Sequence, residues 1–169
     1  MSWLNGPILF LDFDGVLNSA AYARREGKGG ILGLDSSAIP HLQRIVDETG
    51  CSIVVSSSWR IGTMLSELRG NLIEAGMRHP CPVYDATPVL DSVSKGGVMV
   101  SRIRGDEVQA WIDASGYQGR YVCLDDDSDF HPYQPLVKTN WETGLTAEHA
   151  DQCIAILNGS APTVTGNHE

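Results

Sequence analysis

The stretch ILFLDFDGVLN, residues 8–18, decides the fold and raises the first question about function. Its apolar run ILFL follows Pro7 and is typical of a short buried strand that ends at Asp12. Asp12 and Asp14 lie one residue apart, directly before Gly15. An Asp-Gly pair between apolar stretches is also a strong hairpin signal. The stretch alone therefore leaves two interpretations open, a turn between strands or two carboxylates that do chemistry.

The rest of the chain alternates short apolar runs with helical patterns. The β-branched run SIVVS at 52–56 and YVCL at 121–124 predict two more buried strands, and 136–139 predicts a fourth or edge strand. Apolar residues at helical spacing predict four helices, which lie between about 35 and 50, 64 and 76, 106 and 114, and 146 and 159. Strands that alternate with helices are joined by crossovers and run parallel. The expected fold class is therefore α/β, a three-layer, Rossmann-like parallel sheet.

Three segments lack a regular pattern. Residues 15–34 hold five glycines and no steady period, which predicts a mobile flap. Residues 79–97 hold three prolines and a Gly-Gly pair, which predicts irregular chain with one short strand near Val83. The small, polar residues at 161–169 predict a disordered tail. We expect a single domain over about 1–160, without a separate cap domain.

Composition limits the partners of this 169-residue chain. Its 21 acidic and 12 basic residues give a net charge of −9, which argues against a broad basic groove for nucleic acid and against an anionic membrane surface. No apolar run approaches the ~20 residues of a membrane helix, and no signal peptide is evident, so we expect a cytoplasmic location. The four cysteines show no paired spacing, which favours buried thiols over a zinc or redox site.

Polar residues follow three of the predicted strands. Asp12 closes the first strand, Ser56 the second and Asp125 the third. The carboxyl ends of parallel strands meet at one edge, where ligands of such sheets bind. Asp12 and Asp14 project to the same side of an extended chain, and crowded carboxylates need a compensating cation. An all-oxygen set of donors suits Mg²⁺ better than zinc.

A metal beside a carboxylate suggests phosphoryl transfer. Asp12 is then the expected nucleophile, and Asp14 the group that protonates the leaving oxygen and later accepts a proton from water. Ser56 or Ser57 is expected to hold a phosphoryl oxygen. Three basic residues are further candidates: Arg104 or Lys95 as the cation that offsets the nucleophile's charge, and Arg60 as either a surface cation or a phosphate or substrate contact.

Calcium binding and phosphoacceptor signalling are rival roles for the acidic residues. An EF-hand calcium loop read from Asp125 needs Gly and Glu where Phe130 and Leu136 stand. A response-regulator phosphoacceptor domain uses similar residues in a different order, because its acidic pair comes first, a lone Asp mid-chain and its Lys last. A catalytically inactive binding module remains a further alternative.

The order of these motifs resembles that of the haloacid dehalogenase (HAD) superfamily of phosphohydrolases. The motifs are DFDG at 12–15, VVSSSWR at 54–60, a basic residue before a helix, and LDDD at 124–127. More narrowly, SSSWR, RGDEVQAWI at 104–112, YVCLDDD and LVKTNWETGLT at 136–146 are similar to the small HAD domains of Swiss Army Knife RNA repair proteins.

The resemblance implies a role for each strand-end residue. Asp12 matches the nucleophile, which also binds Mg²⁺, and Asp14 matches the acid/base, whose backbone carbonyl is a metal ligand. Ser56 matches the phosphate-binding hydroxyl, with Ser57 as the fallback. Asp125 and Asp126 match the paired acidic metal ligands, and we favour Asp126 as the direct one.

The third motif is where this sequence departs from the family, which usually has Lys there. Arg104 opens a helix at the expected position, whereas Lys95 has the usual side chain in a glycine-rich segment, and we favour Arg104. Without a cap the site is open to bulky substrates, so the resemblance implies a phosphorylated small molecule, a nucleotide or a nucleic-acid end. The sequence does not indicate the oligomeric state. The cations near such a substrate would be Arg24, Arg25, Lys28 and Arg60.

Overall fold

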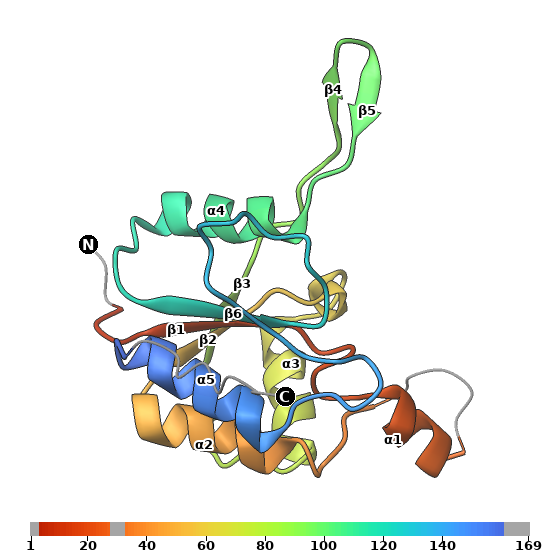
Figure 1. Cartoon of the computed structure of the whole chain (residues 1–169), viewed down its shortest axis with the longest axis vertical. Helices are drawn as coiled ribbons and strands as arrows, with labels where there is room; N and C mark the ends of the chain where they lie inside the picture. Colours follow the sequence, from red (N-terminus) through yellow and green to blue (C-terminus); the bar gives the residue numbers. More distant parts are fainter. Residues whose placement is uncertain (1–3, 28–32, 161–169) are drawn as a thin grey trace, which may run out of the picture.

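The computed structural model describes residues 4–27 and 33–160, with a five-stranded sheet at the centre (Figure 1). The order is β3-β2-β1-β6-β7, and every pairing is parallel. The predicted tail at 161–169 and part of the predicted flap, 28–32, lie outside the described residues. The strands confirm the expected α/β fold: β1 (Ile8–Leu11), β2 (Ser52–Val55), β3 (Val83–Ala86), β6 (Tyr121–Asp125) and β7 (Leu136–Lys138).

Helices cover both faces of the sheet and make the three expected layers (Figure 1). Residues alternate between the faces, so Phe10 of β1 packs edge-on against Trp111 at 5.5 Å between ring centroids, while Leu9 and Leu11 pack into the larger core on the other face. The predicted helix ends at Gly50 and Gly116 are confirmed, because both residues are left-handed C-caps. One face carries α4 (Arg104–Ser115), and the other carries α2 (Ile39–Thr49), α3 (Leu65–Glu74) and α5 (Ala147–Leu157).

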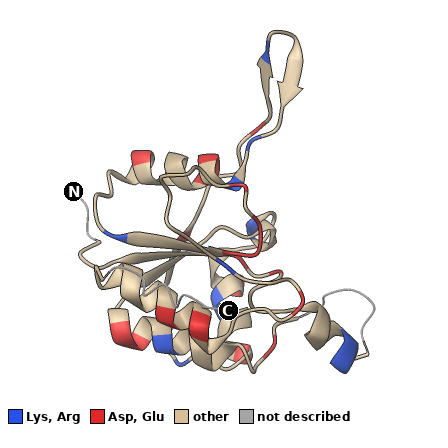
Figure 2. Ribbon diagram, viewed as in Figure 1, with Lys and Arg blue, Asp and Glu red and all other residues tan. Residues whose placement is uncertain are grey.

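The four cysteines are buried thiols, as the sequence predicted. Among the described residues, no helix is long and apolar enough to cross a membrane. Acidic residues lie on α2, α4 and α5 and on the loop that follows β6 (Figure 2).

The segment predicted as an irregular flap is partly regular. Val16 and Leu17 are fully buried in the core, and helix α1 (Ala20–Arg25) follows them. The Ser19 hydroxyl accepts the backbone N–H of Tyr22 and so caps this helix. For residues 15–27 the description as a flap outside the core is therefore wrong, because the glycines concealed a helix of only six residues.

A β-hairpin projects from the molecule beyond α4 (Figure 1). It consists of β4 (Val93–Lys95) and β5 (Val98–Val100), joined by Gly96 and Gly97, whose φ angles are 58° and 80°. Two residues with positive φ make the tight turn that glycine favours. The prediction of irregular chain is wrong here, because strands of three residues are too short to show an alternating pattern.

The strand order places a topological switch point between β1 and β6. The chain leaves β1 for β2 on one side and later returns to β6 on the other. Backbone hydrogen bonds keep the strand ends level: Asp12 donates to Leu124 at 3.0 Å, and Ser56 donates to Leu11 at 2.9 Å. Ligands of open parallel sheets bind at such a point, beyond the carboxyl ends of the strands.

Candidate active site

Three carboxylates meet at the switch point. Asp12 follows β1, Asp125 ends β6, and Asp126 comes next. One oxygen of each lies within 4.8 Å of one oxygen of the others. Asp12 and Asp125 are only 6% and 2% exposed, so water screens their mutual repulsion poorly.

Burial is the main reason why the pKa values of the three carboxyl groups in this cluster are raised. It raises the pKa of Asp12 to about 6, against the hydrogen bond from the Ser57 hydroxyl and the positive charge of Arg104, which lower it. Burial and then the charge of Asp12 raise the pKa of Asp125 to about 7. The pKa of Asp126 is also raised, again mainly by burial. The protein's own cations thus leave negative charge in the cluster uncompensated.

The donor set fits a hard divalent cation. Asp125 Oδ1 accepts the Asp127 backbone N–H at 2.9 Å, but the buried Oδ2 has no hydrogen-bond partner among the described residues. In the described part of the chain, the nearest cation to Oδ2 is the Arg104 guanidinium, whose Nε lies 3.8 Å away. A buried carboxylate oxygen without a donor, beside two more carboxylates, offers a hard divalent cation the oxygen ligands that it prefers.

Gly15 allows Asp126 to approach the cluster. Its φ is +74°, and a Cβ there would lie 2.3 Å from Asp126 Oδ2. The Thr139 hydroxyl donates to the Gly15 carbonyl at 2.8 Å and holds this turn against the end of β7. Gly15 thus has the positive φ of a turn residue, as the turn interpretation of DFDG requires, while Asp12 lies in the carboxylate cluster.

Asp14 is oriented by two donors that the sequence patterns did not identify. Trp59 Nε1 and Asn18 Nδ2 each donate to Asp14 Oδ1 at 2.9 Å. The Trp59 ring also packs on Phe13, with 5.4 Å between centroids. Oδ2 of Asp14 has no hydrogen-bond partner among the described residues, so this oxygen can exchange a proton. Only the place of Trp59 in the SSSWR motif could have indicated its role.

The two serines after β2 have different surroundings. The Ser57 hydroxyl bonds to Asp12, where it lowers the pKa of that carboxyl, and it accepts the Trp59 backbone N–H at 3.3 Å. Ser56 Oγ is buried and has no partner among the described residues. The structure therefore brings Ser57, the second choice from the sequence, against the candidate nucleophile, and leaves the Ser56 hydroxyl able to bond to a ligand.

The two candidate cations are far from equivalent. Arg104 opens α4, pairs with Glu107 at 3.4 Å and lies near Asp125. Lys95 is exposed on the projecting hairpin, in β4, and has no ion pair among the described residues. Of the two, the structure brings only Arg104 to the carboxylate cluster.

Arg60 is buried and connects the segments after β2 and β3 to α4. Its guanidinium donates to the carbonyls of Ser57 at 2.7 Å and Thr87 at 2.8 Å, and pairs with Glu107 at 2.6 Å. Only 4% of its side chain is exposed. These contacts occupy the guanidinium, so the structure does not support the predicted substrate contact of Arg60. The partner on α4 could not be read from the sequence.

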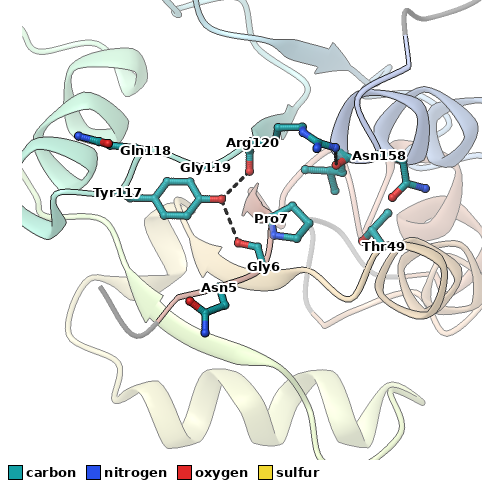
Figure 3. A pocket seen from close by; sticks show the side chains of 10 residues that line it. Asn5, Gly6, Pro7, Thr49, Tyr117, Gln118, Gly119, Arg120 and Asn158 are labelled. Atoms are coloured by element: carbon teal, nitrogen blue, oxygen red, sulfur yellow. Dashed lines mark hydrogen bonds between the residues drawn. The ribbon is translucent and has the colours of Figure 1, made fainter. Parts of the chain in front are cut away.

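A cavity of about 500 Å³ lies at the opposite edge of the sheet (Figure 3). Gly6 and Pro7 precede β1 there, and Arg120 precedes β6. The Tyr117 hydroxyl is shared between the carbonyls of Gly6 and Arg120, at 3.0 and 2.7 Å. Because this cavity is at the other end of the strands from Asp12, it has no part in the carboxylate site.

A Rossmann-like sheet with three carboxylates at its switch point defines an α/β protein with its candidate ligand site beyond the carboxyl ends of the strands. The family model of the HAD domain in Swiss Army Knife RNA repair proteins matches residues 8–150. The chain therefore belongs to this family of the haloacid dehalogenase superfamily, and a phosphohydrolase-type function follows from that membership. No curated protein and no solved structure matches the chain.

Proposed function

We propose that this protein is a Mg²⁺-dependent phosphomonoester hydrolase that acts through an aspartyl-phosphate. Its substrate would be a phosphorylated small molecule, a nucleotide or a phosphorylated nucleic-acid end. The observation that carries the proposal is the cluster of Asp12, Asp125 and Asp126 next to Asp14. Oδ1 of Asp14 accepts two hydrogen bonds, whereas its Oδ2 has no partner among the described residues and can exchange a proton.

In the first step an Asp12 oxygen attacks phosphorus in line with the leaving group. The bond between phosphorus and the leaving oxygen breaks, and Asp14 Oδ2 supplies the proton that this oxygen needs. Ser56 and Ser57 hydroxyls hold the phosphoryl oxygens, and Arg104 offsets the charge of the carboxylates. The products are the free alcohol and phosphorylated Asp12.

In the second step a water molecule gives a proton to Asp14 and attacks phosphorus. The bond to Asp12 breaks, inorganic phosphate leaves, and the carboxylate of Asp12 is regenerated. The residues that would hold Mg²⁺ are Asp12, Asp125 and Asp126, with the backbone carbonyl of Asp14. When bound, the cation supplies positive charge that neutralises the phosphoryl oxygens.

The test is hydrolysis of p-nitrophenyl phosphate with Mg²⁺, with EDTA, and in Asp12→Asn. We expect activity only in the parent with Mg²⁺. Hydrolysis that survives Asp12→Asn unchanged would contradict the mechanism. A long-lived phosphorylated protein without turnover would favour the response-regulator alternative, and binding without either would favour an inactive module. The cytoplasmic location expected from the sequence remains a prediction.

A further inference from the structure

The β4–β5 hairpin contributes no side chain to either hydrophobic core of the described chain. Its two strands form a sheet of their own, separate from the central sheet. The hairpin stands out from the body of the molecule beyond α4 (Figure 1). Because an isolated hairpin of two strands is only marginally stable in water, this one lacks the packing that strands normally have.

The hairpin exposes apolar side chains where it projects. Val98 and Met99 are 65% and 66% exposed, and Val100 is 40% exposed. The register pairs Val93 with Val100 and Lys95 with Val98, so the three valines lie on one face of the hairpin and Met99 on the other. An apolar face that projects into solvent is typical of a surface that another chain covers.

The base of the hairpin is fixed on α4. The Leu90 backbone N–H, before β4, donates to Glu107 Oε1 at 3.2 Å. The Ile103 backbone N–H, after β5, donates to Asp106 Oδ2 at 3.4 Å, and Ile103 is the N-cap of α4. Both ends are thus anchored to one helix, which keeps the strands directed away from the body and accessible to another molecule.

Each strand of the hairpin has an edge of unpaired backbone groups. Lys95 and Val98 flank the two-residue turn, so they form a hydrogen-bonded pair, and bonded and non-bonded pairs alternate from there. The N–H and C=O groups of Ser94 and Met99 therefore point outward, away from the other strand. Neither residue makes a backbone hydrogen bond to the described residues outside the hairpin. Such an edge is a template for a strand of another chain.

The charges beside β4 are complementary to those of a second β4. Asp91 and Lys95 are exposed and lie at equal spacing on either side of Val93. An antiparallel pair of β4 strands centred on Val93 therefore puts Asp91 of each copy opposite Lys95 of the other. Opposite charges across such a pair attract, whereas like charges repel.

The backbone agrees with this register. When the pair is centred on Val93, Ser94 of one copy lies opposite Ser92 of the other, and alternation makes these the residues with outward N–H and C=O groups. The two Val93 residues then face each other, with Cα atoms about 4.5 Å apart. A register centred on Ser94 instead puts Lys95 opposite Val93 and leaves Asp91 without an opposite charge.

We propose that two copies of this chain associate through the β4 edges of their hairpins, in an antiparallel pair with its twofold axis at Val93. The four strands then form one sheet, with the valines of both hairpins on a single face. A second copy fits better than a foreign strand, because the charges of β4 complement those of β4 itself. Strand β5 stays at the outer edge, since its residues VMV carry no charge that selects a register. The contact is small, so we expect a weak dimer that depends on concentration.

Sedimentation velocity of the full chain between about 1 and about 100 µM tests this dimer. We expect the sedimentation coefficient of the parent to rise with concentration. Ser94→Pro removes the outward N–H of β4 but no hydrogen bond within the hairpin, so it should be monomeric. Met99→Pro makes the same change on the edge of β5 and is the matched control, which should dimerise as the parent does.

Two results of this experiment overturn the proposal. One is a parent that stays monomeric throughout, which would leave the edge to a strand of another protein. The other is a dimer that Met99→Pro dissociates and Ser94→Pro does not, because the copies then meet through β5.

Charge reversal tests the register without a proline. In Asp91→Lys, both positions opposite Lys95 carry a like charge, so we expect the dissociation constant of the dimer to rise about tenfold. Lys95→Asp should weaken the dimer to the same extent. The double variant Asp91→Lys/Lys95→Asp restores opposite charges and should dimerise near the level of the parent. A double variant as weak as the single ones overturns the proposal.

A cysteine at the centre of the pair reports position directly. The four native thiols are buried, so an oxidant should link Val93→Cys into a dimer through the new thiol. A disulfide needs Cα atoms about 4.4–6.8 Å apart, which the central pair provides. Val98→Cys lies on β5, far from its copy in the proposed dimer, and should link much more slowly. Equal rates for the two variants on a non-reducing gel overturn the proposed register.

Discussion

The two oxygens of Asp14 have different surroundings. Oδ1 accepts hydrogen bonds from Trp59 and Asn18, so proton exchange falls to Oδ2. Trp59→Phe keeps an aromatic ring against Phe13 but removes one donor. We expect kcat for glycerol 2-phosphate to fall about tenfold, with KM little changed, since one hydrogen bond to a charged group is worth about 1.5–3 kcal/mol. Steady-state kinetics measures both constants.

A suitable control is Trp141→Phe, because Trp141 is 48% exposed and makes no side-chain hydrogen bond to the described residues. The melting temperatures of both variants should stay near that of the parent. If the two variants lose activity equally, the hydrogen bond to Asp14 has no special role.

Arg104 and Lys95 can be told apart by their distances from the carboxylates. Arg104 lies 3.8 Å from Asp125, whereas Lys95 is exposed on the projecting hairpin. We expect Arg104→Met to lower kcat/KM for p-nitrophenyl phosphate about a hundredfold, because the transition state loses a nearby positive charge. Lys95→Met should match the parent in the same assay. The reverse result would assign the third motif to Lys95 and contradict the site described above.

At the scale of elements, the buried ion pair between Arg60 and Glu107 links the sheet edge to α4. Arg60 joins the chain after β2 and β3 to Glu107 of α4, and Glu107 also pairs with Arg104. Removing Arg60 takes the closer cation from Glu107, which keeps Arg104 at 3.4 Å, and leaves the buried carbonyls of Ser57 and Thr87 without this donor. We therefore expect Arg60→Met to lower the free energy of unfolding by about 3 kcal/mol in urea denaturation.

The comparison for this prediction is Arg78→Met. Arg78 pairs with Asp47 on the surface, where 66% of its side chain is exposed. Exposed ion pairs contribute little to stability, so this variant should have the same free energy of unfolding as the parent. An Arg60→Met protein of full stability that fails only in substrate binding would restore the substrate contact expected from the sequence.

Elements with strong local patterns were predictable, and those that depend on distant contacts were not. The strands and the larger helices follow from apolar runs and helical spacing. Helix α1 has only six residues and the strands of the β4–β5 hairpin only three each, so they are too short to show such a pattern. Arg60 shows the same limit within the site, since its partner Glu107 is 47 residues away.

At the scale of the whole molecule, the sheet topology explains why the strand-end carboxylates were predictable. Once the strands are parallel, the residues after β1 and β6 must lie at one edge, and the register places them side by side. Orientation within that edge was not predictable. The preference of Ser57 over Ser56 for Asp12, and the donors to Asp14, depend on how the chain turns after each strand.

The carboxylate cluster also links the stability of the whole fold to pH. Burial raises the pKa of Asp12 and Asp125 in the folded state, to about 6 and about 7. The folded state then binds more protons than the unfolded state between pH 4 and 7, so these groups lower stability as pH rises through that window. In EDTA, Asp125→Asn should be more stable than the parent at pH 8, by on the order of 2 kcal/mol, and this advantage should vanish near pH 4.

Mg²⁺ should reverse the order of stability of the parent and Asp125→Asn at pH 8, because a cation at the cluster favours the ionised carboxylates of the folded state. Free Mg²⁺ at about a hundred times its Kd adds about 2.7 kcal/mol to the free energy of unfolding. We therefore expect Mg²⁺ to raise the melting temperature of the parent at pH 8, but not that of Asp125→Asn. Thermal melts with Mg²⁺ and with EDTA, at pH 5 and pH 8, measure both effects. If Mg²⁺ stabilises Asp125→Asn as strongly as the parent, the cation binds elsewhere, since that variant lacks the buried carboxylate whose Oδ2 has no other partner among the described residues.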